Sequence, residues 1–133
     1  MALLVGVLLA LSVGFFATAV GLDRDRAFYP VVTIVVGSYY ALFAAMAAST
    51  HALVVELLAG AVFLAAAVAG FRWSLWAAVA ALAAHGILDF IHAAVISNPG
   101  VPDWWRDFCF SYDVTAAVYL AWLLKSGRIR AVA

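Results

Sequence analysis

The chain has 133 residues, of which 69% are hydrophobic and only 11% are charged, and its mean hydropathy is +1.14. A soluble domain carries about 25% charged residues, so this composition excludes a soluble globular domain and leaves lipid as the main solvent. Seven basic and seven acidic residues balance without a basic patch, which argues against nucleic acid as a partner. The single cysteine, Cys109, excludes an internal disulfide.

Five apolar runs are each long enough to cross a bilayer as a helix, which requires about 20 residues. The runs are continuous rather than alternating, and open sheet edges cannot face lipid, so we expect no strands. We predict an all-α integral membrane protein, with one domain over residues 1–133 that forms a helical bundle with short loops. The predicted transmembrane spans cover about residues 2–22, 28–48, 51–70, 74–96 and 108–124.

Short polar or turn-forming segments separate these predicted spans. Asp23–Arg26 ends the first run, and Ser49–Thr50 leaves room only for a tight turn, so the second and third spans should form an antiparallel hairpin. Asn98–Pro102 breaks the chain before the last span. Ala17–Ala19 resembles a signal-peptidase site, but no basic residue precedes the first run and the run is longer than a usual signal core. We therefore expect a true span there.

Basic residues are distributed unequally between the two ends of the spans. One side carries only Arg106. The other side carries Arg24, Arg26, Arg72, Lys125, Arg128 and Arg130. Because basic loops stay in the cytoplasm, this bias predicts a multi-pass protein of a bacterial inner membrane, with an external N-terminus and a cytoplasmic C-terminus.

Ionisable residues within the predicted spans gather at one depth. Counting from the span ends at about 1.5 Å per residue places Tyr40, Glu56, Asp89 and Asp113 in the outer half of the bilayer, with His85 near its middle. A carboxyl group near the membrane centre costs about 2.5–3.5 kcal/mol on insertion scales, and such residues by default mark functional sites. The sequence therefore predicts a polar site that opens outward.

The fourth span contains the string HGILDFIH, whose polar residues are His85, Asp89 and His92. Offsets of four and three residues place these side chains on one helical face, and together they suit a divalent metal such as zinc, iron or manganese. Glu56 or Asp113 would complete the coordination or act as a general base, so the catalytic candidates are Glu56, Asp89 and Asp113. The pattern is not diagnostic. The same residues could also form a proton relay without metal or a purely structural hydrogen-bond network, and both alternatives remain.

Aromatic residues near the outer end are the candidates for contacting a substrate. Trp104 and Trp105 lie in the outer loop before the last span, Tyr112 lies near the start of that span, and Tyr40 lies at the depth of Asp89. We predict that these four aromatic residues bind a small hydrophobic or amphipathic ligand, such as a membrane lipid or an isoprenoid. Indoles also anchor proteins at the membrane boundary, so that alternative stays open for the two tryptophans.

The sequence lacks the residues that several known activities of membrane proteins require. The only lysine, Lys125, lies outside the spans, which excludes a retinal Schiff base, and there is no GxSxG, HExxH or glycine-rich phosphate loop. We expect a metal-dependent membrane enzyme that acts on a lipid- or isoprenoid-type substrate. The alternatives are a proton- or cation-coupled transporter or channel working as a homo-oligomer, and a lipid-binding or assembly subunit without turnover.

Overall fold

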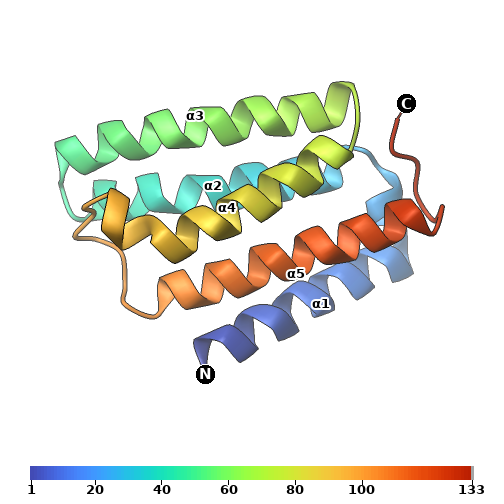
Figure 1. Ribbon diagram of the computed structural model, residues 1–133, viewed down its shortest axis with the longest axis horizontal. Coiled ribbons are helices and arrows are strands. Elements are labelled where there is room, and N and C mark those ends of the chain that lie inside the picture. Colours follow the sequence, from blue (N-terminus) through green and yellow to red (C-terminus); the bar gives the residue numbers. More distant parts are fainter. Residues whose placement is uncertain (133) are drawn as a thin grey trace.

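The computed structural model describes residues 1–132, so Ala133, the last residue of the predicted domain, lies outside the described part. Residues 1–132 form five α-helices and one short 3₁₀ helix, without any strand (Figure 1). The elements are α1 (Ala2–Val20), η1 (Leu22–Arg24), α2 (Phe28–Met46), α3 (Thr50–Arg72), α4 (Trp76–Val95) and α5 (Trp105–Lys125). The predicted all-α class is confirmed.

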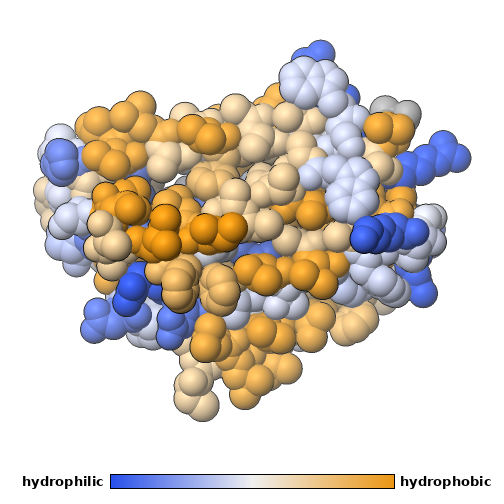
Figure 2. Space-filling model, viewed as in Figure 1, coloured by the Kyte–Doolittle hydropathy of each residue, from blue (hydrophilic) through white to orange (hydrophobic). Residues whose placement is uncertain are grey.

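Helices α1 to α4 are long and apolar enough to cross a membrane, as judged by length and composition. Figure 2 shows hydrophobic side chains over the middle of one face and hydrophilic side chains near its two ends. Helix α5 covers the predicted fifth span but is less apolar than the other four, because it carries Asp107, Asp113 and Lys125. Since α5 packs against both α1 and α4, protein rather than lipid surrounds its buried Asp113.

The order of the helices in space differs from their order in the chain. Helix α2 packs against α3, α4 packs against α3 and α5, and α1 packs against α5 (Figure 1). Although α1 and α2 are consecutive, their backbones do not pack against each other within residues 1–132; η1 links them. The two helices therefore diverge, and α5 lies behind the gap between them.

Small residues allow α1 to lie close to α5. The buried residues of α1 are Gly6, Ala10, Gly14 and Ala17, which recur every three or four positions and form one stripe. A Cβ atom at Gly14 would lie only 2.9 Å from the ring of Tyr119 on α5. The close approach of the two backbones covers one side of α5.

The bundle has two chemically different ends. The α2–α3 turn and the α4–α5 loop lie at one end, which we call the Asn98 end (Figure 1). The other end, with η1, the α3–α4 turn and the segment after α5, is called the arginine end. All six basic residues assigned to the cytoplasmic side lie at or near the arginine end, while Arg106 lies at the Asn98 end. The folded chain thus carries its basic residues mainly at one end, as the sequence predicts. The orientation of that end in the membrane stays a prediction.

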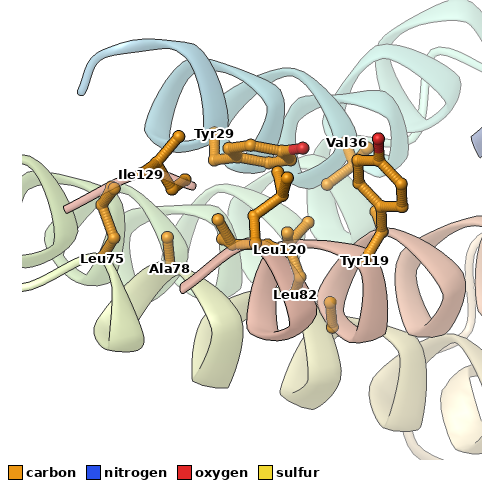
Figure 3. Packing of buried hydrophobic residues seen from close by; sticks show 11 residues of the cluster. Tyr29, Val36, Leu75, Ala78, Leu82, Tyr119, Leu120 and Ile129 are labelled. Carbon is orange, nitrogen blue, oxygen red and sulfur yellow. The ribbon is translucent and has the colours of Figure 1, made fainter. Parts of the chain in front are cut away.

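The half of the bundle nearer the arginine end contains an apolar core (Figure 3). Helix α4 contributes its first turns to this core, α5 its last turns, and α2 packs over both. The largest contributors are Tyr29, Val36, Leu75, Leu82, Tyr119, Leu120, Leu123 and Ile129. This core fills the interior between the arginine end and the middle of α4.

Candidate functional site

The polar face of α4 turns into the bundle. His85, Asp89 and His92 are 1%, 0% and 2% exposed, which agrees with their predicted position on one helical face. Gly86 lets α5 approach this face, because a Cβ atom there would lie 3.0 Å from Val114. The three polar side chains meet partners from α2, α3 and α5, so α4 is the element around which the site is built.

His85 meets two carboxylates inside the bundle. Its Nδ1 lies 2.6 Å from Asp113 Oδ2 and 3.4 Å from Asp89 Oδ2. The hydroxyl of Tyr40 on α2 donates a 2.7 Å hydrogen bond to the other oxygen of Asp89. All four side chains are buried. We call His85, Asp89, Asp113 and Tyr40 the His85 cluster.

The His85 cluster leaves two carboxylate oxygens unsatisfied. Among the described residues, neither Asp89 Oδ2 nor Asp113 Oδ1 has a hydrogen-bond partner, although both atoms are buried. One imidazole supplies at most one positive charge to the two carboxylates, and buried charge without a partner is costly. The cluster therefore has the electrostatic capacity for one more positive charge, from a proton or from a metal ion.

The geometry of the His85 cluster is compact enough for a metal. One ligand atom from each of His85, Asp89 and Asp113 lies within 4.8 Å of the other two. Ligands placed about 2.1 Å from a tetrahedral zinc ion are about 3.4 Å apart, so small side-chain adjustments would bring the three atoms to one ion. Three protein ligands also leave a coordination position open, which is typical of catalytic rather than structural sites.

His92 faces a different carboxylate. Its Nε2 lies 2.8 Å from Glu56 Oε1, and the amide of Asn98 donates to the same oxygen at 2.9 Å. We call Glu56, His92 and Asn98 the His92 group. The ring of His92 stacks on the ring of Tyr40 with centroids 3.9 Å apart. Tyr40 therefore contacts both groups: its hydroxyl belongs to the His85 cluster, and its ring packs against His92 of the His92 group.

The predicted metal ligands His85, Asp89 and His92 do not meet at one point. Seven residues of helix advance by about 10.5 Å, and His92 Nε2 is hydrogen-bonded to Glu56 rather than grouped with His85 and Asp89. Asp113 occupies the third position beside His85 and Asp89. Glu56 and Asp113, which we expected in one pocket, belong to two adjoining groups. Metal binding by any of these residues stays a prediction.

Asn98 is a site residue that the sequence presented only as part of a loop. After α4 ends, the loop folds back so that the Asn98 amide reaches Glu56 and the backbone oxygen of Tyr40, at 2.9 and 3.0 Å. Asn98 Oδ1 accepts a hydrogen bond from Gly100 N, which fixes the turn. Asparagine before Pro-Gly is a signal for a turn, but it does not indicate which buried acid the amide will reach.

An apolar cavity of about 440 Å³ lies where α1 and α2 diverge over α5. Three of the predicted ligand-binding residues, Trp104, Trp105 and Tyr112, line it, whereas Tyr40 lies in the His85 cluster instead. Cys109 also lines this cavity, one turn before Asp113 on α5. The cavity and the His85 cluster therefore lie against the same stretch of α5.

A second cavity, of about 260 Å³, is polar and lies at the Asn98 end. His92, Asn98, Asp103 and Arg106 are among the residues that line it. Water at this end can thus approach the His92 group, while the apolar core closes the opposite direction. Glu56 of the same group also lines a cavity between α2 and α3, whose other lining residues are mostly apolar.

Replacing Tyr40 by phenylalanine tests whether the hydroxyl holds Asp89. Tyr40→Phe removes the donor to Asp89 Oδ1 and leaves another buried carboxylate oxygen unsatisfied, which typically costs about 1–3 kcal/mol. We expect a lower melting temperature for this variant in detergent solution, with less change in Tyr39→Phe. Tyr39 is a matched control because its ring contacts Trp105 and its hydroxyl lies outside the His85 cluster. Equal melting temperatures for the two variants would contradict the role assigned to Tyr40.

Comparison of the chain with models of protein families, with curated proteins and with solved structures gives no match. Function is therefore inferred from the site. Its main features are a buried set of one imidazole and two carboxylates, a linked His–Glu pair, and two cavities of opposite polarity.

Proposed function

We propose that the chain is a membrane enzyme that depends on a divalent metal and acts on a lipid- or isoprenoid-type substrate. The metal ligands would be His85, Asp89 and Asp113. One observation carries this proposal: these three buried residues place ligand atoms within 4.8 Å of one another, and two of their carboxylate oxygens have no hydrogen-bond partner in the described chain. A divalent cation would compensate the buried negative charge, and this set of donors suits zinc, iron or manganese.

A cation at this position would supply Lewis acidity, polarising a substrate oxygen and generating a nucleophile from water. The protein's part is to orient the ligands. Because Tyr40 donates to Asp89 Oδ1, the other oxygen of Asp89 faces His85. Such hydrogen bonds to a ligating carboxylate fix its direction and tune its affinity for metal. Tyr40 therefore acts as a positioning residue and not as a ligand.

In this proposal Glu56 and His92 exchange protons with water in the polar cavity, next to the His85 cluster. They are hydrogen-bonded to each other at 2.8 Å, and His92 both lines that cavity and stacks on Tyr40. Imidazole and carboxylate groups are the commonest general acids and bases in enzymes. Asn98 holds Glu56 in place through its amide. In this proposal Glu56 keeps the predicted role in proton transfer, whereas Asp89 and Asp113 bind metal.

The apolar cavity supports a substrate with a hydrocarbon chain. Its lining residues come from α1, α2 and α5, and α1 and α2 leave a gap through which a chain in the bilayer could enter. Trp104 and Trp105 lie at the Asn98 end of this cavity. A substrate whose hydrocarbon tail lies along α5 past Cys109 would have its polar end directed towards Asp113. The substrate would then come from lipid and water from the polar cavity.

A proton-coupled transporter working as a homo-oligomer is the second candidate. It is favoured by the short His85–Asp113 and His92–Glu56 contacts, 2.6 and 2.8 Å, because each histidine already has a carboxylate partner without metal. Against it, the apolar core closes the path towards the arginine end. A second copy of the chain would have to complete any route across the membrane.

Metal analysis of the purified protein separates these two candidates. We expect one equivalent of metal per chain in the wild type and in His92→Ala, and loss of metal in His85→Ala and Asp113→Asn. His51→Ala is the control, because His51 is exposed and lies outside both groups. Metal lost from His92→Ala but kept in Asp113→Asn would show that the ligand set is wrong. Metal-free wild-type protein with proton flux in liposomes would favour the transporter.

Cross-linking tests the apolar cavity separately from the metal. A phospholipid with a diazirine in its acyl chain should label residues around the cavity when the protein is reconstituted in bilayers. Val35→Phe narrows the cavity and should reduce this labelling several-fold, because the added ring occupies the space of the chain. Val54→Phe places the same ring on an exposed position of α3 and should leave the labelling unchanged. If labelling did not decrease in Val35→Phe, the cavity would not be a chain-binding site.

A further inference from the structure

A second concave site lies at the arginine end. A pocket of about 370 Å³ opens between η1 and the segment that follows α5. Four arginines line it: Arg24 and Arg26 from the η1 side, and Arg128 and Arg130 from the segment after α5. The apolar core of Figure 3 lies between this pocket and the His85 cluster, so an inference about the pocket does not rest on the proposed enzyme function.

Arg26 builds one wall of the pocket and is not free to bind a ligand. Its guanidinium donates hydrogen bonds to the backbone oxygens of Gly70, Phe71 and Ala131, at 3.2, 3.1 and 3.1 Å. The backbone N–H of Leu75 also donates to Ala131, at 2.8 Å. Arg26 therefore fastens the C-terminal segment to the end of α3 and the start of α4.

The turn after α5 presents two further arginines. Gly127 adopts a φ of 69°, a left-handed conformation that suits glycine, and Arg128 N donates to Leu123 O, as in a Schellman motif. Ile129 then inserts into the apolar core. Since Arg128 and Arg130 flank this anchored residue, their backbone is held at the pocket instead of extending into solvent.

The protein neutralises the positive charge of the pocket only in part, because four arginines line the pocket and a single carboxylate does. The only lining carboxylate, Asp23, is buried and accepts a 2.6 Å hydrogen bond from Thr18. In the part of the chain that the structure describes, every ion pair within 4 Å involves a histidine. Arg24, Arg128 and Arg130 are exposed, and none of them has a carboxylate within 4 Å among the described residues.

The pocket lies where lipid headgroups would begin if the helices span a bilayer. It is next to the ends of α1 and α5, and the exposed tryptophans Trp73, Trp76 and Trp122 lie at the same end. Tryptophan is enriched at membrane–water interfaces. The guanidinium of Arg128 lies 4.5 Å from the centre of the Trp122 ring, which restricts its orientation.

We propose that this pocket binds a phosphate group, with Arg24, Arg128 and Arg130 donating to its oxygens. The planar guanidinium fork matches phosphate in a bidentate geometry. Three arginines without a carboxylate within 4 Å in the described residues line this pocket from two sides. A phospholipid headgroup and free phosphate share this chemistry. The position at headgroup level and the attraction of anionic lipids to basic residues beside a span favour the lipid. A bound phosphate would link η1 to the C-terminal segment.

Binding of two probes to the purified full chain tests this proposal. The probes are a short-chain phosphatidylglycerol, followed by native mass spectrometry, and inorganic phosphate, followed by equilibrium dialysis. We expect saturable binding of the phosphatidylglycerol, weakened at least about tenfold by Arg128→Gln with Arg130→Gln, because two charged donors are lost. Arg24→Gln on the opposite wall should weaken it as well. This single change tests the pocket even if the double variant does not fold.

Arg72→Gln with Lys125→Gln is the matched control. It removes the same two charges from the same end, but neither residue lines the pocket, so we expect binding to change by less than about twofold. Inorganic phosphate that binds the wild type, competes with the lipid and is lost in the Arg128–Arg130 variant would support the same pocket with free phosphate as the ligand. Equal weakening in both double variants, or unsaturable binding to the wild type, would overturn the proposed site.

Discussion

The burial of five ionisable side chains inside a lipid-facing bundle is the constraint on which the rest of the structure depends. Glu56, His85, Asp89, His92 and Asp113 are each almost fully buried, and the membrane offers no water to solvate them. Each must therefore be shielded and paired by other helices. This requirement explains why α5, the least apolar helix, lies between α1 and α4, and why small residues occur where backbones must approach closely.

The same constraint divides the bundle into two halves with different roles. Towards the arginine end, leucines and aromatic residues of α2, α4 and α5 form an apolar core that fixes the helix packing. Towards the Asn98 end, those three helices and α3 direct polar side chains inwards, and the loop after α4 adds Asn98. The polar site therefore has the apolar core on one side and the polar cavity of the Asn98 end on the other.

The fold and the half of the bundle that contains the polar residues could be predicted from the sequence, but the pairing among these residues could not. Continuous apolar runs ended by charges define the helices, and the four- and three-residue offsets place His85, Asp89 and His92 on one face. Which acid meets which histidine depends on the spatial order of the helices. Because α5 packs on one side of α4 and α3 on the other, Asp113 meets His85 and Glu56 meets His92. No local pattern encodes that order.

Two further features could not be predicted from the sequence, because they too depend on the spatial order of the helices. The apolar cavity exists because α1 and α2 diverge while α5 lies behind them, and nothing in the η1 segment alone indicates such a separation. The hydrogen bond from Asn98 to Glu56 joins residues 42 positions apart through a folded loop. Turn propensity predicts where the chain bends, whereas the partner of the amide is fixed only by tertiary packing.

X-ray absorption spectroscopy of the metal-loaded full chain tests most directly whether His85, Asp89 and Asp113 form one site. If the proposed metal site is right, we expect a shell of nitrogen and oxygen ligands with a single imidazole, and the imidazole signal should disappear in His85→Ala and persist in His92→Ala. A shell with two imidazoles, or an imidazole signal that depends on His92, would contradict the assignment of the site to α4 and α5.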